Sequence, residues 1–390
     1  MAEVTNYIDR LVAELCPDGV EYRPLGEIAD IGTGKSDKKD AQESGQYPFY
    51  VRSKTILRSS KYLYDETAIV IPGEGGVGEI FHFVSGKYDL HQRAYRISFT
   101  VDEMNPKFGY YYISSFFKEY INRHAVEATV KSIRKPMLVK FEVPVPPLEI
   151  QEAIVEILDK FTNLEAELEA ELEARTLQYE YYRDSLFEAL DCPRVPLGSF
   201  AQLVRGSGMP KTDFSESGVG AIHYGQIYTK FGTATAEVIT HVPEEKAKKL
   251  AVVNPGDVIV ANTSENLEDV CKAVAWVGDS DIVTGGHATV IKAPEQNAKF
   301  ISYYMATGRF NKDKRRHAFG TKVIDVAPKN LAKIEFPVPP LEEQQRIVDI
   351  LDRFDSLTTS LSEGLPAELA ARRSQYEYYR DHLLTFPEKK

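Results

Sequence analysis

The 390-residue chain repeats itself. Residues 178–184 and 375–381 both read QYEYYRD, while residues 146–151 and 339–344 read PPLEIQ and PPLEEQ. A seven-residue identity at matching places in two similar stretches is too improbable for chance, so the sequence contains two copies of one unit. A duplicated unit favours a two-fold arrangement and a target with two halves.

Each copy begins with a domain that starts at Pro-Leu-Gly, in residues 24–26 and 196–198. Short apolar or alternating runs predict strands at 62–64, 68–71, 80–84 and 95–99, and again at 257–260, 274–277 and 288–291. A helical patch follows at 108–123 and 300–316. At a constant offset, Tyr111 matches Tyr304, Phe117 matches Phe310, His124 matches His317 and Pro144 matches Pro337.

Each domain is followed by a stretch with apolar residues at helical spacing. Pro147 and Pro340 fit the first turn of a helix, where a missing N–H costs nothing. Each helix should run about 40 residues, or about 60 Å. One apolar stripe on a charged helix requires a partner, and the other copy is the simplest one. The second helix is four residues longer between matched motifs, and Gly364 and Pro366 predict a kink there.

The repeat is also circular. The second QYEYYRD motif has no domain after it, but residues 7–15 precede the first Pro-Leu-Gly as the missing continuation would. We therefore expect the N-terminal segment beside the end of the last helix, with the halves related by a pseudo-two-fold axis. The predicted fold class is α+β, with two β-rich domains separated by two long helices that form an antiparallel coiled coil. The expected segments are residues 1–22, 23–146, 147–192, 193–339 and 340–390.

The net charge of −11 is unevenly distributed. Residues 144–193 carry 3 Lys or Arg against 13 Asp or Glu, whereas residues 23–143 and 194–336 each carry 18 against 15. Two mildly basic domains on acidic helices are compatible with nucleic-acid binding by the domains alone. Three cysteines without metal spacing indicate a reduced, cytoplasmic protein. No apolar run has the length of a membrane span, and residues 1–20 do not resemble a signal peptide.

Over nearly its whole length the sequence resembles a specificity subunit of a type I restriction–modification system. The residues that carry this resemblance are Pro-Leu-Gly at each domain start, PPLExQ at each helix start and YEYYRD late in each helix. The resemblance implies that the domains are target recognition domains that bind double-stranded DNA at a bipartite, asymmetric site. It also implies a noncatalytic chain that binds two methyltransferase subunits and, in the full complex, restriction–translocation subunits. S-adenosylmethionine for adenine-N6 methylation, ATP and Mg would then lie on those partners.

Cations at corresponding places in both domains suggest phosphate contacts, and base readout requires Arg, Lys, Asn or Gln on loops or strands. Tyr224, Gln226, Tyr228 and Lys230 alternate and would present one polar face. Solvated surface charges are the alternative interpretation. The candidates are Lys35, Lys38, Lys39, Arg52, Lys54, Arg58, Lys131, Arg134 and Lys135 in the first domain, and Arg205, Lys211, Gln226, Lys230, Lys312, Lys314, Arg315, Arg316 and Lys322 in the second.

The tyrosine-rich motif suggests an interface with the methyltransferase subunits. Tyr181, Arg183, Tyr378 and Arg380 are the candidates, and plain helix packing is the alternative.

No catalytic or metal site is expected. Residues 73–78 match GxGxxG, but the following residues read as a strand, whereas a dinucleotide site needs a helix there. His124 and His317 have no second ligand at useful spacing. The Asn/Asp-Pro-Pro-(Tyr/Phe) tetrad of methyltransferases is absent from the sequence. The alternative function is a noncatalytic scaffold of β domains and a coiled coil that binds proteins without DNA specificity.

Residues 164–175 contain a four-residue repeat, LEAE-LEAE-LEAR, and generate a prediction. Inserting one more LEAE unit should lengthen the helix by about 6 Å, comparable to one or two base pairs. We expect the methylated site to gain spacer while both half-sites stay the same. Sequencing of methylated DNA tests this, and an unchanged spacer would contradict it.

Overall fold

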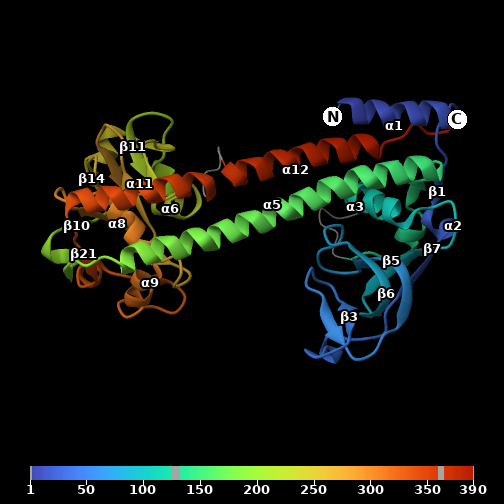
Figure 1. Cartoon of the computed structure of the whole chain (residues 1–390), viewed down its shortest axis with the longest axis horizontal. Helices are drawn as coiled ribbons and strands as arrows, with labels where there is room; N and C mark the ends of the chain where they lie inside the picture. Colours follow the sequence, from blue (N-terminus) through green and yellow to red (C-terminus); the bar gives the residue numbers. More distant parts are fainter. Residues whose placement is uncertain (1, 124–131, 359–363, 390) are drawn as a thin grey trace. The chain divides into compact units, whose positions relative to one another are not determined.

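The computed structural model describes residues 2–123, 132–358 and 364–389 (Figure 1). It divides into two compact units, the first formed by Met1–Glu167 with Ala370–Lys390 and the second by Leu168–Leu369. Among the described residues, no helix is both long enough and apolar enough to cross a bilayer. The fold class is the predicted one, since each unit combines a β-rich domain with parts of the long helices.

The first unit is built on a six-stranded sheet with the order β2-β7-β5-β6-β3-β4. All its strand pairs are antiparallel except β3 with β6. A two-stranded ribbon of β1 and β8 closes the domain. The elements are α1 (Ala2–Leu15), β1 (Tyr22–Pro24), α2 (Leu25–Ile28), β2 (Ala29–Thr33), η1 (Lys38–Asp40), β3 (Tyr47–Tyr50), β4 (Leu57–Ser59), β5 (Tyr64–Pro72), β6 (His82–Leu90), β7 (Ala94–Phe99), α3 (Pro106–Arg123), α4 (Lys135–Val139) and β8 (Glu142–Pro144).

The second unit repeats this plan but divides the sheet in two. The strand equivalent to β6 is broken into β17 and β18, and the Trp276 Nε1 donates to Ser280 O in the turn between them, at 2.8 Å. The result is a sheet ordered β10-β19-β15-β17-β12 and another ordered β13-β11-β18-β14. The principal elements are β9 (Arg194–Pro196), β10 (Gln202–Arg205), β11 (Val219–Ile222), α6 (Tyr224–Thr229), β12 (Ala234–Thr235), β13 (Thr240–Val242), α7 (Glu244–Ala247), β14 (Ala251–Val253), β15 (Val258–Ala261), β16 (Thr263–Ser264), β17 (Ala273–Trp276), β18 (Ile282–Thr284), β19 (Ala288–Lys292), α8 (Ala298–Met305), α9 (Gly308–Lys314), β20 (Ile324–Asp325), α10 (Pro328–Leu331) and β21 (Glu335–Pro337), with short 3-10 turns η2 (Leu197–Ser199) and η3 (Lys211–Asp213).

The long helices begin just after the proline pairs. Helix α5 (Leu148–Glu188) has 41 residues, close to the predicted 40. The second stretch consists of α11 (Leu341–Thr358) and α12 (Gly364–Leu383). Helix α12 begins at Gly364, whose φ of 74° suits glycine, and this is where the sequence predicts a kink.

The glutamine of PPLExQ joins each helix to its domain. Gln151 is fully buried, donates to Pro146 O at 2.6 Å and to Glu103 O at 2.8 Å, and accepts from Asn105 N at 2.8 Å. Its copy Gln344 is 1% exposed, donates to Pro339 O at 2.8 Å and accepts from Asn297 N at 2.9 Å. One amide therefore satisfies backbone groups of both the helix start and the domain, which explains why the motif requires glutamine.

A helix carboxylate supplies the second fastening. Tyr111 and Lys107 of α3 both reach Asp159 of α5, the lysine at 3.5 Å. The same contacts recur in the second unit, where Asp352 accepts from Tyr303 at 2.7 Å and from Lys299 at 2.8 Å.

These contacts correct one sequence match. The equivalent of Tyr111 is Tyr303, not Tyr304. The predicted helix at 300–316 is interrupted, because α8 ends at Met305 and Thr307 then caps the start of α9 by accepting from Phe310 N. The extra residue at this break shifts the register, so the constant offset holds for Phe310 but not before it.

The two long helices pair antiparallel within each unit. In the first, Phe161 of α5 stacks on Tyr379 of α12 with ring centroids 5.6 Å apart, and Glu165 pairs with Arg373 at 2.7 Å. Positions rise along α5 as they fall along α12. In the second unit Tyr182 stacks on Phe354 at 5.8 Å, with the same interplanar angle of 23°. The stacking pair is thus repeated with the roles of the two helices exchanged, as a cyclic repeat requires.

The chain termini meet in the first unit, as the cyclic repeat predicts. Val20 N donates to Pro387 O at 2.8 Å, and Lys389 N donates to Val20 O at 2.9 Å. Helix α1 lies beside the end of α12, where His382 approaches Asp9 at 3.4 Å (Figure 1). In the second unit the continuous chain from α5 into β9 occupies the corresponding place, and Val338 N donates to Pro193 O as Val145 N donates to Glu21 O.

The buried glutamines generate a stability prediction. Gln151→Met keeps the volume but leaves Asn105 N, Glu103 O and Pro146 O without a partner, at a cost of about 2–3 kcal/mol. We expect the midpoint of thermal unfolding to fall by about 5–10 °C. Gln344→Met should behave alike, whereas Gln178→Met, on the exposed surface of the same α5, should change little. A Gln151→Met protein as stable as the Gln178→Met control would contradict this.

Candidate nucleic-acid interface

The parallel strands β3 and β6 end together in the first unit, and loops converge around their carboxyl ends. We call residues 34–40, 51–54, 73–74 and 91–93 the first rim. Gly34 shows how tightly the rim is packed, because a Cβ built there would lie 1.8 Å from Leu90 O. Gly206 faces Gly285 O at 1.9 Å in the second unit, so the glycine shared after both domain starts reflects close backbone approach.

Asp89 at the end of β6 organises the first rim. Its side chain is 1% exposed and accepts from Ser36 Oγ at 2.8 Å, Ser59 Oγ at 2.9 Å and Leu90 N at 2.9 Å. Ser36 belongs to the loop after β2, and Ser59 follows the loop between β3 and β4. One buried carboxylate therefore fixes the loop that carries Lys35, Lys38 and Lys39 to the end of β4.

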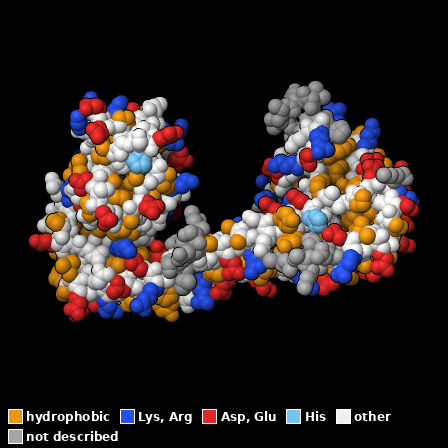
Figure 2. All heavy atoms as spheres, turned by 90° about the horizontal axis from the view of Figure 1, so that it is seen from above, with side chains coloured by type: hydrophobic (Ala, Val, Ile, Leu, Met, Phe, Trp, Pro, Cys, Tyr) orange, Lys and Arg blue, Asp and Glu red, His pale blue; other side chains and the backbone are white. Residues whose placement is uncertain are grey.

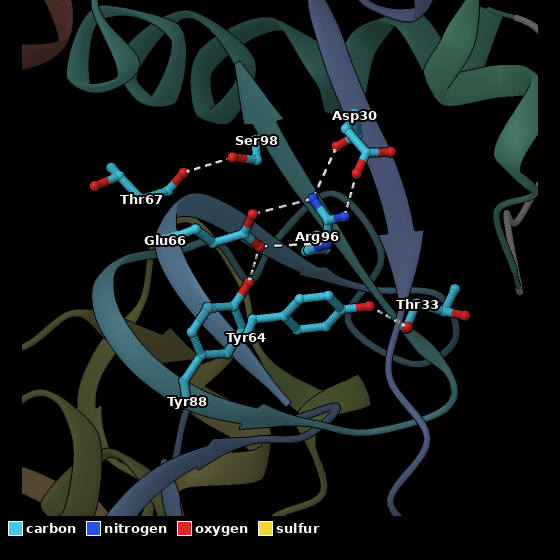
Figure 3. Close-up of polar contacts among 8 residues, drawn as sticks. All are labelled: Asp30, Thr33, Tyr64, Glu66, Thr67, Tyr88, Arg96 and Ser98. Atoms are coloured by element: carbon cyan, nitrogen blue, oxygen red, sulfur yellow. Dashed lines mark hydrogen bonds and ion pairs between the residues drawn. The ribbon is translucent and has the colours of Figure 1, made fainter. Parts of the chain in front are cut away.

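A polar network beneath the rim ties four strands together (Figure 3). Arg96 of β7 is 8% exposed and binds Asp30 of β2 and Glu66 of β5, while its guanidinium lies 4.5 Å from the Tyr64 ring. Tyr88 donates to Glu66 at 2.8 Å, and burial raises the pKa of that phenol. Tyr64 donates to Thr33 O at 2.8 Å, which anchors the residue that precedes Gly34.

Two arginines of the first rim share one carboxylate. Arg52 and Arg93 donate to the same Glu74 Oε2 at 3.1 and 2.9 Å. The sequence singled out Arg52 but missed Arg93, whose place in a three-residue turn between β6 and β7 becomes clear only once those strands are paired. Glu74 also bridges to Ser132, which brings Arg134 and Lys135 to the same rim.

The other candidates in the first unit differ in availability. Lys35, Lys38, Lys39, Arg134 and Lys135 are exposed, and within the described part of the chain no ion pair engages them. Lys54 is also exposed. Lys131 and His124 lie outside the described residues.

Arg58 is less available than the sequence suggests. It donates to the backbone oxygens of Gly45 and Gln46, at 2.9 and 2.8 Å. Its guanidinium therefore holds the loop between η1 and β3, which argues against a base contact by this residue.

The second unit has a hollow at the matching place, which we call the second rim. Arg205, His223, Tyr224, His287 and five residues of its glycine-rich loops line this hollow, whose volume is about 530 Å³. The Tyr224 and His287 rings lie 5.1 Å apart, and His287 holds a left-handed φ of 66°. His223 Nδ1 accepts from Gly225 N at 3.1 Å, and burial lowers the pKa of this imidazole. Arg205 pairs with Asp325 at 3.4 Å, and Lys211 is exposed.

The predicted polar face at residues 224–230 is wrong. Tyr224–Thr229 forms helix α6, so residues two apart point in different directions. Gln226 completes the helix cap by accepting from His223 N and donates to Thr240 Oγ1, which removes it as a base reader. Tyr228 donates to Thr263 O at 2.7 Å, while Lys230 is exposed.

The basic cluster at and after α9 contains one buried member. Lys314 is 2% exposed and donates to Glu268 O and Val270 O, both at 2.7 Å, so its assignment as a phosphate contact is wrong. Burial lowers the pKa of this amine. Lys312 and Lys322 are exposed, whereas Arg315 pairs with Glu268 and Arg316 with Asp313. Figure 2 shows basic and acidic side chains interspersed on the face that it draws.

The tyrosine motif makes the same contacts in both copies. Tyr181 and Tyr378 are 69% and 68% exposed, which keeps both available for a partner. Arg183 and Arg380 each lie 5.7 Å from the ring four residues earlier and bind the following aspartate at 2.9 Å. Arg183 is 8% exposed, which argues against a contact between its guanidinium and a partner subunit.

The chain thus has two β-rich domains attached to antiparallel helices, and each domain carries a rim of polar loops. This architecture is typical of a protein that recognises its target through two separate domains. The family model described as "Type I restriction modification DNA specificity domain" matches residues 17–174 and 193–371. The chain therefore belongs to this family of type I restriction–modification DNA specificity proteins.

Several known proteins are similar to this chain over nearly its whole length. The chain is 33% identical to the EcoR124I/EcoR124II specificity subunit of Escherichia coli over 98% of its length and 97% of that protein. The fold resembles the type I S subunit of M. genitalium, with a TM-score of 0.57 and 16% identity over 94% of this chain and 96% of that one. A second solved structure, which concerns complex assembly and conformational transition of the type I restriction–modification system, matches with a TM-score of 0.58 and 15% sequence identity. The match covers 94% of this chain and 97% of that one.

The exposed and buried lysines generate a paired prediction. Replacing Lys35, Lys38 and Lys39 by Gln should weaken binding to all DNA sequences alike, and should reduce the salt slope by about 0.9 for each phosphate that is no longer neutralised. Lys314→Met should instead leave the salt slope unchanged, because this amine contacts only carbonyl groups. Binding titrations at several salt concentrations measure both. A triple variant with an unaltered slope would remove these lysines from the interface.

Proposed function

We propose that the chain recognises a bipartite, asymmetric DNA site as the noncatalytic specificity subunit of a type I restriction–modification complex. One observation carries this proposal. The helix-to-domain fastenings are the same in both units, whereas the rims that end their parallel strands carry different side chains. Two domains that are attached to their helices by the same contacts, but whose rims carry different side chains, suit a DNA site with two unlike halves.

We also propose two methyltransferase subunits as partners, with restriction–translocation subunits in the full complex. The equal exposure of Tyr181 and Tyr378 supports two equivalent partner surfaces. Among solved structures with this fold, one concerns assembly of the type I system. S-adenosylmethionine, ATP and Mg would be bound by those partners, and the complex would work in the cytoplasm, in keeping with three cysteines that are all free thiols.

Co-expression tests the proposal. The chain is produced together with a candidate adenine methyltransferase subunit from the same genome, and methylated bases are sequenced across the host DNA. We expect methylated adenines within two short half-sites that are separated by a spacer of constant length and free sequence. Cells that produce the methyltransferase subunit alone serve as the control and should lack this methylation. Methylation without a split motif, or independent of the chain, would refute the proposal and favour the protein-only scaffold.

A further inference from the structure

The two rims place a matched pair of side chains at the same structural positions. Arg52 lies two residues after the end of β3, and Arg93 lies one residue before β7. In the second unit Tyr224 lies two residues after β11, and His287 lies one residue before β19. Both pairs flank a parallel strand pair, β3 with β6 and β11 with β18.

The members of each pair also meet in space. Arg52 and Arg93 meet on Glu74 Oε2, and Tyr224 and His287 meet through their rings, 5.1 Å apart. The two units therefore share the position of this side-chain pair but differ in its chemistry. The first unit has guanidinium and carboxylate groups there, and the second has a phenol and an imidazole.

The first pair is accessible and held in place. The side chains of Arg52, Glu74 and Arg93 are 41%, 41% and 57% exposed. His91 Nδ1 accepts from Arg93 N at 3.0 Å, and Ile133 N donates to Gly73 O at 2.9 Å beside the glutamate. Each guanidinium uses one N–H group on Glu74 and keeps further donors free for a ligand.

A carboxylate between two guanidiniums discriminates among nucleic-acid groups. It repels a phosphate, so the triad is a poorer phosphate site than the unpaired lysines of the same rim. Guanine presents the acceptors N7 and O6 in the major groove, which arginine binds through two hydrogen bonds, and its partner cytosine presents the N4 amino donor, which a glutamate accepts. Donors and an acceptor side by side match a G·C pair.

We propose that Arg52, Glu74 and Arg93 read a G·C base pair in the half-site bound by the first unit, with an arginine on guanine and Glu74 on cytosine. This inference rests on the proposed function and adds the base chemistry of one half-site. Tyr224 and His287 occupy the matched position in the second unit, so the other half-site is read there without a guanidinium pair.

The test uses the complex of full-length chain and methyltransferase subunit, with methylated motifs sequenced. In the Arg93→Gln and Arg52→Gln complexes, the preference for G·C at one position of one half-site should fall roughly 5- to 150-fold, while the other half-site is unchanged. His287→Ala should alter only that other half-site. Arg123→Gln, which removes the same charge from α3 where Arg123 pairs with Glu119, should leave every base preference intact.

The outcomes separate this inference from the proposed function. A wild-type complex without a split motif refutes the function itself. A split motif whose base preferences survive both arginine substitutions, or change in the half-site that His287→Ala alters, overturns the inference alone. If Arg93→Gln abolishes all methylation, Arg93→Lys decides, because lysine retains the ion pair with Glu74 but lacks the two-pronged guanine contact. Undiminished G·C preference in the lysine variant would also overturn it.

Discussion

Each recognition domain depends on a buried amide and a carboxylate that fasten it to a long helix. Gln151 and Gln344 satisfy backbone groups of helix and domain together, and Asp159 and Asp352 each bind a tyrosine and a lysine of the neighbouring domain helix. Buried polar groups are costly without partners, so the contacts of the two buried glutamines impose one geometry where apolar packing alone would tolerate several. The sheet and its rim take their position relative to that helix from this geometry.

This constraint explains where the two units differ. Asp89 pairs with Phe49 next to the end of β3, and Val283 holds the corresponding place opposite Ala221 in β11. The first rim is therefore organised by a buried carboxylate, whereas the second is organised by a glycine-rich hollow and a capping histidine. Neither change reaches Gln151 or Gln344, so the reading surfaces can diverge while the fastening remains the same.

The features that could be predicted from the sequence are those that repeat between the two copies or that follow a regular apolar spacing. Long-helix starts, the circular order and the central strands follow from the proline pairs and apolar spacing, because burial on one face imposes a period. Residues whose role depends on a partner distant in sequence could not be ranked in the same way. Lys314 and Lys312 look alike in a basic cluster, yet carbonyls of Glu268 and Val270 bury the first. The alternation of Tyr224, Gln226 and Tyr228 imitates a strand, but the His223 cap starts a helix there.

The charge balance of each domain has a consequence for how DNA is bound. Each has only slightly more Lys and Arg than Asp and Glu, and acidic partners engage cations such as Arg205, Arg315 and Arg316. Nonspecific affinity grows with the number of phosphates neutralised, so the cations that are paired with acidic side chains add little to the binding of arbitrary DNA. A larger share of the binding energy must then come from base edges. Joining two such domains in one chain makes the second contact intramolecular, which raises the affinity for a site that holds both halves at the right spacing.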